Sequence, residues 1–206
     1  MIKIENVEIA GLEPAIRGMR NPMNSWDKSD SFYDDGGNYV FGENDLGLAQ
    51  RLCKSGSDHR KFIRQIFVSV DIMAPLYWWK EYDTYKVATV ANSTSTMHKI
   101  HSATFSFDDF SCDKMTDETK KKMENVIDYL ETLRVKFNET KDKAYWYDMI
   151  QFLPSSYNQL RTCSFNYETL INIYNSRKNH KLDEWHVFCA WIESLPYAKE
   201  LICDLK

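Results

Sequence analysis

Small polar side chains gather in one short stretch of the chain, between residues 86 and 98. The hydroxyl and amide residues of this stretch are Thr89, Asn92, Ser93, Thr94, Ser95 and Thr96. Lys86 precedes them, and His98 and Lys99 follow. Hydroxyls and backbone N–H groups in a turn can bind an anion when cations lie beside them. The stretch is therefore a candidate phosphate-binding loop, although a plain Ser/Thr-rich turn explains the composition equally well.

Histidine is the second residue type that could bind a ligand here. The H-x-x-H spacing of His98 and His101 could hold a metal ion only with further ligands from elsewhere, and no paired Cys or His motif supplies them. We therefore expect no metal site. His98 is explained as well by a position on the surface as by contact with a ligand.

The standard catalytic and nucleotide-binding motifs are absent. The chain has no G-x-x-x-x-G-K-[ST], G-x-G-x-x-G, H-E-x-x-H or G-x-S-x-G sequence. The run of three lysines at 120–122 is most simply a solvated helix face, and the Trp78-Trp79 pair is more typical of a core than of a cofactor site. The residues alone therefore assign no catalytic side chain.

Composition excludes several classes of protein. The 206 residues carry 26 Lys plus Arg against 30 Asp plus Glu, so a net charge of −4 offers no basic surplus for coating nucleic acid. No apolar run reaches the length of a membrane span, and five cysteines without C-x-x-C spacing indicate reduced thiols. We expect one cytoplasmic domain over residues 1–206, with no nucleic-acid or membrane partner. Its 14% aromatic content also suits a flat-ring ligand.

Hydrophobic periodicity predicts the elements that must position the polar stretch. Alternation predicts strands over residues 1–10, with a bulge near Asn6, over 63–72 and over 160–165. Apolar spacings of three and four predict helices near 45–55, 75–86, 117–137, 141–152, 167–177 and 182–195. Expected caps are Asn44, Thr116 and Asn166, with Gly56 as a left-handed stop. Residues 18–43 read as a long irregular loop, and the order of elements places the chain in the α+β class.

The C-terminal third adds a family resemblance. Leu153-Pro154, Tyr157, Asn166, Leu170 and Arg177 occur in the order and at the intervals found in the flavin-dependent thymidylate synthases, which this chain resembles. Trp185 follows after a small length difference. Upstream, Gly56, His59, the strand at 63–72 and Ala74-Pro75 also match without a gap, so the similarity covers most of residues 44–192.

The resemblance implies a fold, cofactors and partners. The fold would be the thymidylate synthase complementing-protein-like one, with a mixed or antiparallel sheet and several helices. A homotetramer would bind FAD between subunits and reductively methylate the nucleotide dUMP, with NADPH and methylene-tetrahydrofolate as cosubstrates. The flavin would carry the hydride, so the reaction requires no protein nucleophile.

The resemblance also implies site residues. Those expected to bind the cofactor are Lys86, Thr89, Asn166, Asn172 and Arg177. Those expected to bind the nucleotide are Asn92, Ser93, Thr94, Ser95, Thr96 and again Arg177. Aromatic side chains such as Tyr85 could stack on the flavin ring.

The chain departs from the family where it binds anions. The family signature, Arg-His-Arg-x-x-Ser-x-Asn-Glu-x-Ser-x-Arg-Tyr, falls on residues 84–97, where only Lys86, Thr89 and Thr94 are chemically similar. Ile150 and Thr96 stand where the family has arginines, and a hydroxyl cannot replace a guanidinium charge. The alternative is therefore a degenerate or re-purposed homologue that binds a nucleotide or a protein without methylating dUMP.

Overall fold

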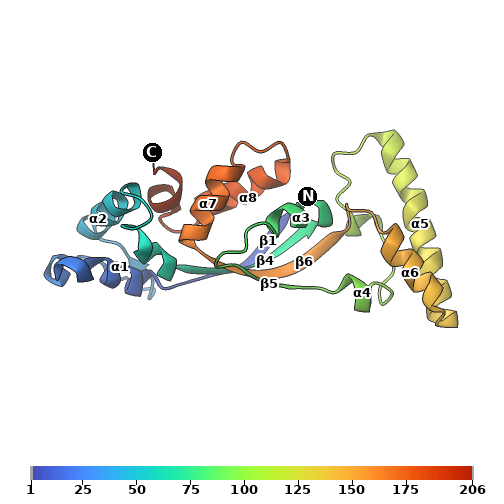
Figure 1. Cartoon of the computed structure of the whole chain (residues 1–206), viewed down its shortest axis with the longest axis horizontal. Helices are drawn as coiled ribbons and strands as arrows, with labels where there is room; N and C mark the ends of the chain where they lie inside the picture. Colours follow the sequence, from blue (N-terminus) through green and yellow to red (C-terminus); the bar gives the residue numbers. More distant parts are fainter. Residues whose placement is uncertain (1, 206) are drawn as a thin grey trace. The chain divides into compact units, whose positions relative to one another are not determined.

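The computed structural model describes residues 2–205 (Figure 1). It combines helices with an antiparallel sheet, which confirms the predicted α+β class. The main sheet has four strands in the order β1-β4-β6-β5. These strands are β1 (Lys3–Ala10), β4 (Phe67–Pro75), β6 (Asn158–Asn166) and β5 (Val90–Ser93). A separate two-stranded sheet pairs β2 (Phe32–Tyr33) with β3 (Tyr39–Val40).

Strand β4 shows why alternation is a reliable signal. Val68, Val70 and Ile72 are buried, and the residues between them are partly exposed. On β4 and β6, side-chain hydrogen bonds pair Ser69 with Ser164 and Asp71 with Thr162. The numbers rise along one strand as they fall along the other, so the two strands are antiparallel. The predicted start at residue 63 is wrong, because Lys61–Gln65 form a 3-10 helix, η3.

The chain divides into two compact units. Unit 1 contains residues 71–84 and 91–162 together with the N-terminal residues up to Glu5. Unit 2 contains Asn6–Val70, Tyr85–Val90 and the residues from Cys163 onward. All four strands of the main sheet contribute residues to both units. The expectation of a single domain over residues 1–206 stays a prediction.

Unit 1 is built around a helical hairpin. Its helices are α3 (Leu76–Tyr82), α4 (Thr96–Lys99), η4 (Phe107–Asp109), α5 (Asp117–Thr140) and α6 (Lys143–Phe152). Helices α5 and α6 lie side by side (Figure 1), and Met123, Ile127 and Leu130 of α5 are buried against Met149 of α6. Both helices and the Thr116 cap of α5 confirm the predictions.

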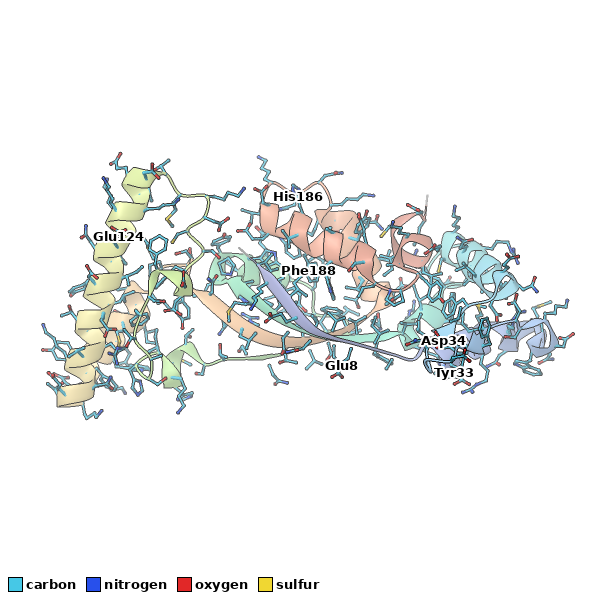
Figure 2. All side chains as sticks on the ribbon, turned by 180° about the vertical axis from the view of Figure 1, so that it is seen from behind. Glu8, Tyr33, Asp34, Glu124, His186 and Phe188 are labelled. Carbon is cyan, nitrogen blue, oxygen red and sulfur yellow. The ribbon has the colours of Figure 1, made fainter. Side chains whose placement is uncertain are left out.

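Unit 2 consists mainly of helices of 12 residues or fewer, and α7 packs against several of them. Its helices are α1 (Leu12–Arg20), η1 (Asn21–Met23), η2 (Trp26–Lys28), α2 (Glu43–Lys54), η3, α7 (Tyr167–Arg177), α8 (Asp183–Ser194) and the π-helical turn η5 (Lys199–Cys203). Helix α7 packs against α8, η3 and η5. On α8, Phe188 points into the core while His186 points outward (Figure 2).

The predicted loop at 18–43 is more ordered than expected. It contains the end of α1, both short 3-10 helices and the β2–β3 hairpin, on whose exposed tip Tyr33 and Asp34 lie (Figure 2). Tyr39 makes edge contacts with Tyr33 and Phe41, so aromatic packing replaces the periodic pattern that sequence reasoning looks for. The expected irregular loop is therefore correct only for the turns between these elements.

The boundaries of helices α2 and α3 also differ from prediction. Gly42, not Asn44, precedes α2, and the Asp30 carboxylate accepts from the backbone N–H groups of Asn44 and Asp45 at 2.8 and 3.0 Å. Helix α3 begins after Pro75 and ends at Tyr82, four residues short of the predicted end at 86. Gly56 has the expected left-handed φ of 99°.

Gly11 closes the turn between β1 and α1. Its φ is 91°, and a Cβ at this position would collide with the backbone carbonyl oxygen of Gln65. Only glycine combines this conformation with so close an approach. Asn6, where a bulge was predicted in β1, also has a left-handed φ of 53°.

Candidate functional site

The predicted site residues fall in different parts of the structure. Those expected to bind the cofactor, namely Lys86, Thr89, Asn166, Asn172 and Arg177, all belong to unit 2. Those expected to bind the nucleotide, residues 92–96, belong to unit 1. Each group is therefore described within its own unit.

Arg177 ends α7 and is held by aromatic side chains. Its Nε donates a hydrogen bond of 2.7 Å to the Tyr85 hydroxyl. The guanidinium carbon lies 4.6 Å from the Trp185 ring centroid and 5.4 Å from that of Tyr85. Cation–π contacts of this kind fix the orientation of a guanidinium and leave its charge intact. Arg177 is thus a half-buried, pre-oriented cation.

The segment after Tyr85 is fastened to the start of α7. The Thr169 hydroxyl donates to the Val87 carbonyl at 3.1 Å, and Ala88 has a left-handed φ of 56°. The Thr89 hydroxyl donates back to the Tyr85 carbonyl at 2.5 Å, so its proton closes a turn within the chain. Lys86, between these anchors, is exposed. Of this segment, the Lys86 ammonium is the group best placed to meet an anion from solvent.

Asn166 and Asn172 differ in environment although both were expected to bind the cofactor. Asn166 is buried, and its Oδ1 accepts from the Thr169 N–H at 3.0 Å. This is an N-cap, which confirms the predicted start of α7. Asn172 lies exposed on the same helix. Asn166 therefore has a structural task that the resemblance did not anticipate.

In unit 1, the segment Asn92–Thr96 comprises the last two residues of β5, which pairs with β6, and the three residues after it. The Thr94 N–H donates to the Leu160 carbonyl at 2.9 Å, and the Ser95 hydroxyl caps α4 by accepting from the His98 N–H at 3.0 Å. Asn92, Ser93 and Thr94 are exposed. The Thr94 hydroxyl also donates to the Leu160 carbonyl at 3.3 Å, so β6 holds both the backbone and one side chain of this exposed segment.

Sequence reasoning missed Arg161, on β6 in the same unit. Its Nη1 bonds to Asp83 at 2.6 Å, its Nε bonds to Gln159 at 3.0 Å, and its guanidinium stacks 4.2 Å from the Trp79 ring centroid. The Gln159 side chain in turn donates to the Thr94 carbonyl at 2.7 Å. The only sequence feature that could have identified Arg161 was the two-residue side-chain periodicity of strand β6, which places Gln159 and Arg161 on the same face.

A cavity of about 770 Å³ opens in unit 2. Its apolar wall includes Met19, Leu48, Leu52 and Phe62, and its polar lining includes Asp58, His59, Lys61 and Gln65. Small-molecule sites are typically concave and mostly apolar, with a few polar groups that fix orientation. None of the predicted cofactor residues lines this cavity, whereas His59 belongs to the matching stretch upstream.

An ion pair connects the cavity wall with α7. The Arg60 Nε donates to both carboxylate oxygens of Glu168, at 3.0 and 3.2 Å, and its Nη2 adds a third bond at 3.0 Å. Arg60 is flanked by His59 and Lys61, while Glu168 lies in the first turn of α7. This forked arrangement fixes η3, and with it one wall of the cavity, against α7.

Four of the cysteine thiols, those of Cys53, Cys112, Cys189 and Cys203, are poor nucleophiles. Burial raises the pKa of Cys53 and of Cys189 to about 12, and that of Cys203 to about 11. Burial also raises the pKa of Cys112. The thiolate is the reactive form, so these four side chains are protonated and unreactive at neutral pH.

Within residues 2–205, no three His, Cys, Asp or Glu side chains are grouped so that they could hold a metal ion. Among the described helices, none is both long and apolar enough to span a membrane.

Comparison with solved structures shows the fold. Thymidylate synthase X (ThyX) of Helicobacter pylori with FAD and dUMP superposes with a TM-score of 0.71 and 18% identity, over 100% of this chain and 99% of that one. A second structure of that enzyme with FAD and dUMP gives a TM-score of 0.69, again at 18% identity, over 98% and 99% of the two chains.

A third solved structure has a similar fold. The UMP/dUMP methylase PolB of Streptomyces cacaoi, bound to 5-Br dUMP, has a TM-score of 0.64 and 15% identity over 98% and 94% of the two chains. No protein-family model and no curated protein matches this sequence. At such identities the comparison confirms the predicted ThyX-like fold and nothing finer.

Proposed function

We propose that this chain is a flavin-dependent enzyme that modifies a pyrimidine nucleotide, dUMP or a close relative. The observation that carries the proposal is the full-length likeness to structures that hold FAD and dUMP. The likeness to a UMP/dUMP methylase supports nucleotide modification independently of thymidylate synthesis. The finer proposal is reductive methylation of dUMP with NADPH and methylene-tetrahydrofolate, by a homotetramer.

The cavity of unit 2 fits a planar ring system. Its apolar wall of Met19, Leu52 and Phe62 matches the faces of an isoalloxazine, and the polar groups of His59 and Lys61 match its heteroatom edge. FAD bound here would supply hydride-transfer chemistry that no side chain of the protein can supply. The protein would contribute binding, orientation and exclusion of water.

Two cationic side chains, Lys86 and Arg177, would neutralise the phosphate groups of the ligands. Lys86 is exposed and Arg177 is already oriented by Tyr85 and Trp185, so both meet the requirement for binding an anion. In unit 1, the exposed side chains of Asn92, Ser93 and Thr94, with Ser95 and Thr96, would bind the polar groups of the nucleotide. Thr89, Asn166 and Asn172 do not line the cavity, so they would contact the part of FAD that extends beyond the isoalloxazine, with Asn166 acting chiefly through the position of α7.

A second candidate function is nucleotide or protein binding without methylation. It is favoured by the internal use of the Thr89 and Asn166 side chains and by the apolar Ile150. Release of tritium from 5-tritiated dUMP, in the presence of FAD, NADPH and methylene-tetrahydrofolate, distinguishes the two. Release above a no-enzyme control supports dUMP methylation. A protein that binds FAD and dUMP but releases no tritium contradicts methylation and supports the binding function.

A further inference from the structure

We propose that Arg161 is the positioning residue of the nucleotide-binding segment Asn92–Thr96. This inference rests on the proposed function of that segment, but the contacts that define it lie within unit 1. Arg161 belongs to none of the sequence motifs and is not one of the residues matched to the family. Its importance follows from three side chains, those of Trp79, Asp83 and Gln159, that meet at its guanidinium group.

Trp79 and Asp83 hold the guanidinium in a single orientation. Trp79 is buried, and its ring lies 4.2 Å from the Arg161 guanidinium carbon. Asp83 accepts from Nη1 at 2.6 Å, and the Arg161 side chain is only 14% exposed. A stacked and ion-paired guanidinium has little rotational freedom, so its remaining N–H groups point in defined directions.

One of these directions leads through Gln159 to the nucleotide-binding segment. The Arg161 Nε donates to Gln159 Oε1 at 3.0 Å. Because the amide oxygen faces Arg161, the amide nitrogen faces the other way, and it donates to the Thr94 carbonyl at 2.7 Å. The Gln159 amide is buried, so either bond left unmade would cost free energy.

The chain of contacts thus runs from Asp83 through Arg161 and Gln159 to the Thr94 backbone. On the other side of Thr94, its N–H donates to the Leu160 carbonyl at 2.9 Å. Asp83 precedes the segment aligned with the family signature and Thr94 lies within it. Arg161 therefore connects the residue just before that segment, Asp83, with one residue inside it, Thr94, and holds the segment from a strand outside it.

Amide hydrogen exchange of Thr94 measures the positioning directly. An Arg161→Met variant should accelerate this exchange about tenfold, which corresponds to about 1.4 kcal/mol of local stability. An Arg134→Met variant is the matched control, because Arg134 is also half-buried at 17% exposure and paired with an acid, Glu131, in the same unit. It should leave Thr94 exchange at the wild-type rate. Amides of α5 should stay protected in Arg161→Met, which shows that the protein is folded.

Nucleotide affinity separates a positioning role from a merely structural one. Binding of dUMP to the FAD-loaded protein should weaken about tenfold in Arg161→Met and stay unchanged in Arg134→Met. An Arg161→Lys variant keeps the charge but loses the fork, so it should not restore affinity. Unchanged Thr94 exchange in Arg161→Met overturns the inference, and so does faster exchange with unchanged affinity. A wild-type protein that binds no nucleotide overturns the proposed function instead, while the exchange data still report whether Arg161 holds Thr94.

Discussion

Arg177 and Tyr85 form a hydrogen-bonded pair, in which the arginine Nε donates to the tyrosine hydroxyl at 2.7 Å. The pair ties the last residue of α7 to the segment that aligns with the family signature. The Thr169 contact to Val87 adds a second tie at the start of the same helix. Helix α7 therefore determines the course of residues 85–89, and the Arg177 cation is oriented before any ligand arrives.

Replacing Tyr85 with phenylalanine should weaken FAD binding. The ring stays and only the hydroxyl that orients Arg177 is lost, so the expected loss is about 1 kcal/mol, or roughly fivefold in affinity. Fluorescence titration with FAD measures it. Tyr33→Phe is the matched control, because the Tyr33 hydroxyl also bonds to one charged group, Glu13, on the exposed hairpin. Equal losses in both variants would contradict a special role of the Arg177–Tyr85 pair.

Substitutions of Asn166 should separate its capping role from cofactor contact. Asn166→Ala should lower the free energy of unfolding by about 1 kcal/mol, and Asn166→Asp should restore most of it, because aspartate is an equally good N-cap. Urea denaturation measures both values. Asn172→Ala, on the exposed face of the same helix, should leave stability unchanged. A stable Asn166→Asp protein with wild-type FAD affinity assigns Asn166 to structure, whereas one that is stable but has lost FAD affinity identifies a cofactor contact.

Filling the cavity of unit 2 should block the flavin. Leu48 lines the cavity, so Leu48→Trp would place a large ring in the space proposed for isoalloxazine. We expect FAD affinity to fall by at least about tenfold while the far-ultraviolet circular dichroism stays unchanged. Lys54→Trp is the control, because Lys54 is exposed on the same helix and does not line the cavity. Wild-type FAD binding by Leu48→Trp would place the flavin elsewhere.

Acid should destabilise the protein through Asp45. Burial opposes ionisation of Asp45, but the hydroxyls of Ser31 and Ser29 together with Arg20 outweigh it and lower the pKa. A pKa below the ordinary value of 3.8 means that this stabilisation is complete above pH 3.8 and is lost as the pH falls through the folded-state pKa. Arg20 and Asp45 form a buried ion pair with side-chain exposures of only 4% and 0%.

Asp45→Asn tests this assignment. At neutral pH the variant should be about 3 kcal/mol less stable than the wild type, because Arg20 keeps a buried charge without its partner. Urea denaturation across a pH series should show the difference shrinking below pH 3.8. A difference that stays constant down to acid-induced unfolding would assign the acid sensitivity to other carboxylates.

The elements predicted correctly are those defined by local signals. Helix α5 was predictable because its apolar residues recur at helical spacing behind the Thr116 cap, and α7 because Asn166 marks its start. Helix α1 was missed, since it is only nine residues long and Gly18 disfavours a helix, although Pro14 is tolerated in its first turn. Burial of Ala15, Ile16 and Met19 stabilises it instead, and that is a tertiary effect.

The candidate site was harder to predict than the fold, because its residues are also held by tertiary contacts. Residues 86–96 stood out by composition, but their fixing partners come from distant parts of the chain. Arg161 bonds to Asp83 across 78 residues and Arg177 to Tyr85 across 92. The cavity in unit 2 likewise draws its wall from four helical elements, α1, η1, α2 and η3. No spacing rule in one sequence brings such residues together.

Titration of the purified protein with FAD, followed by addition of dUMP, tests the central proposal most directly. We predict a saturable change in the visible absorption bands of the flavin, a rise in thermal stability with FAD, and a further perturbation of the bands by dUMP. A protein whose thermal stability and flavin spectrum stay unchanged at every FAD concentration would contradict a flavin-dependent function.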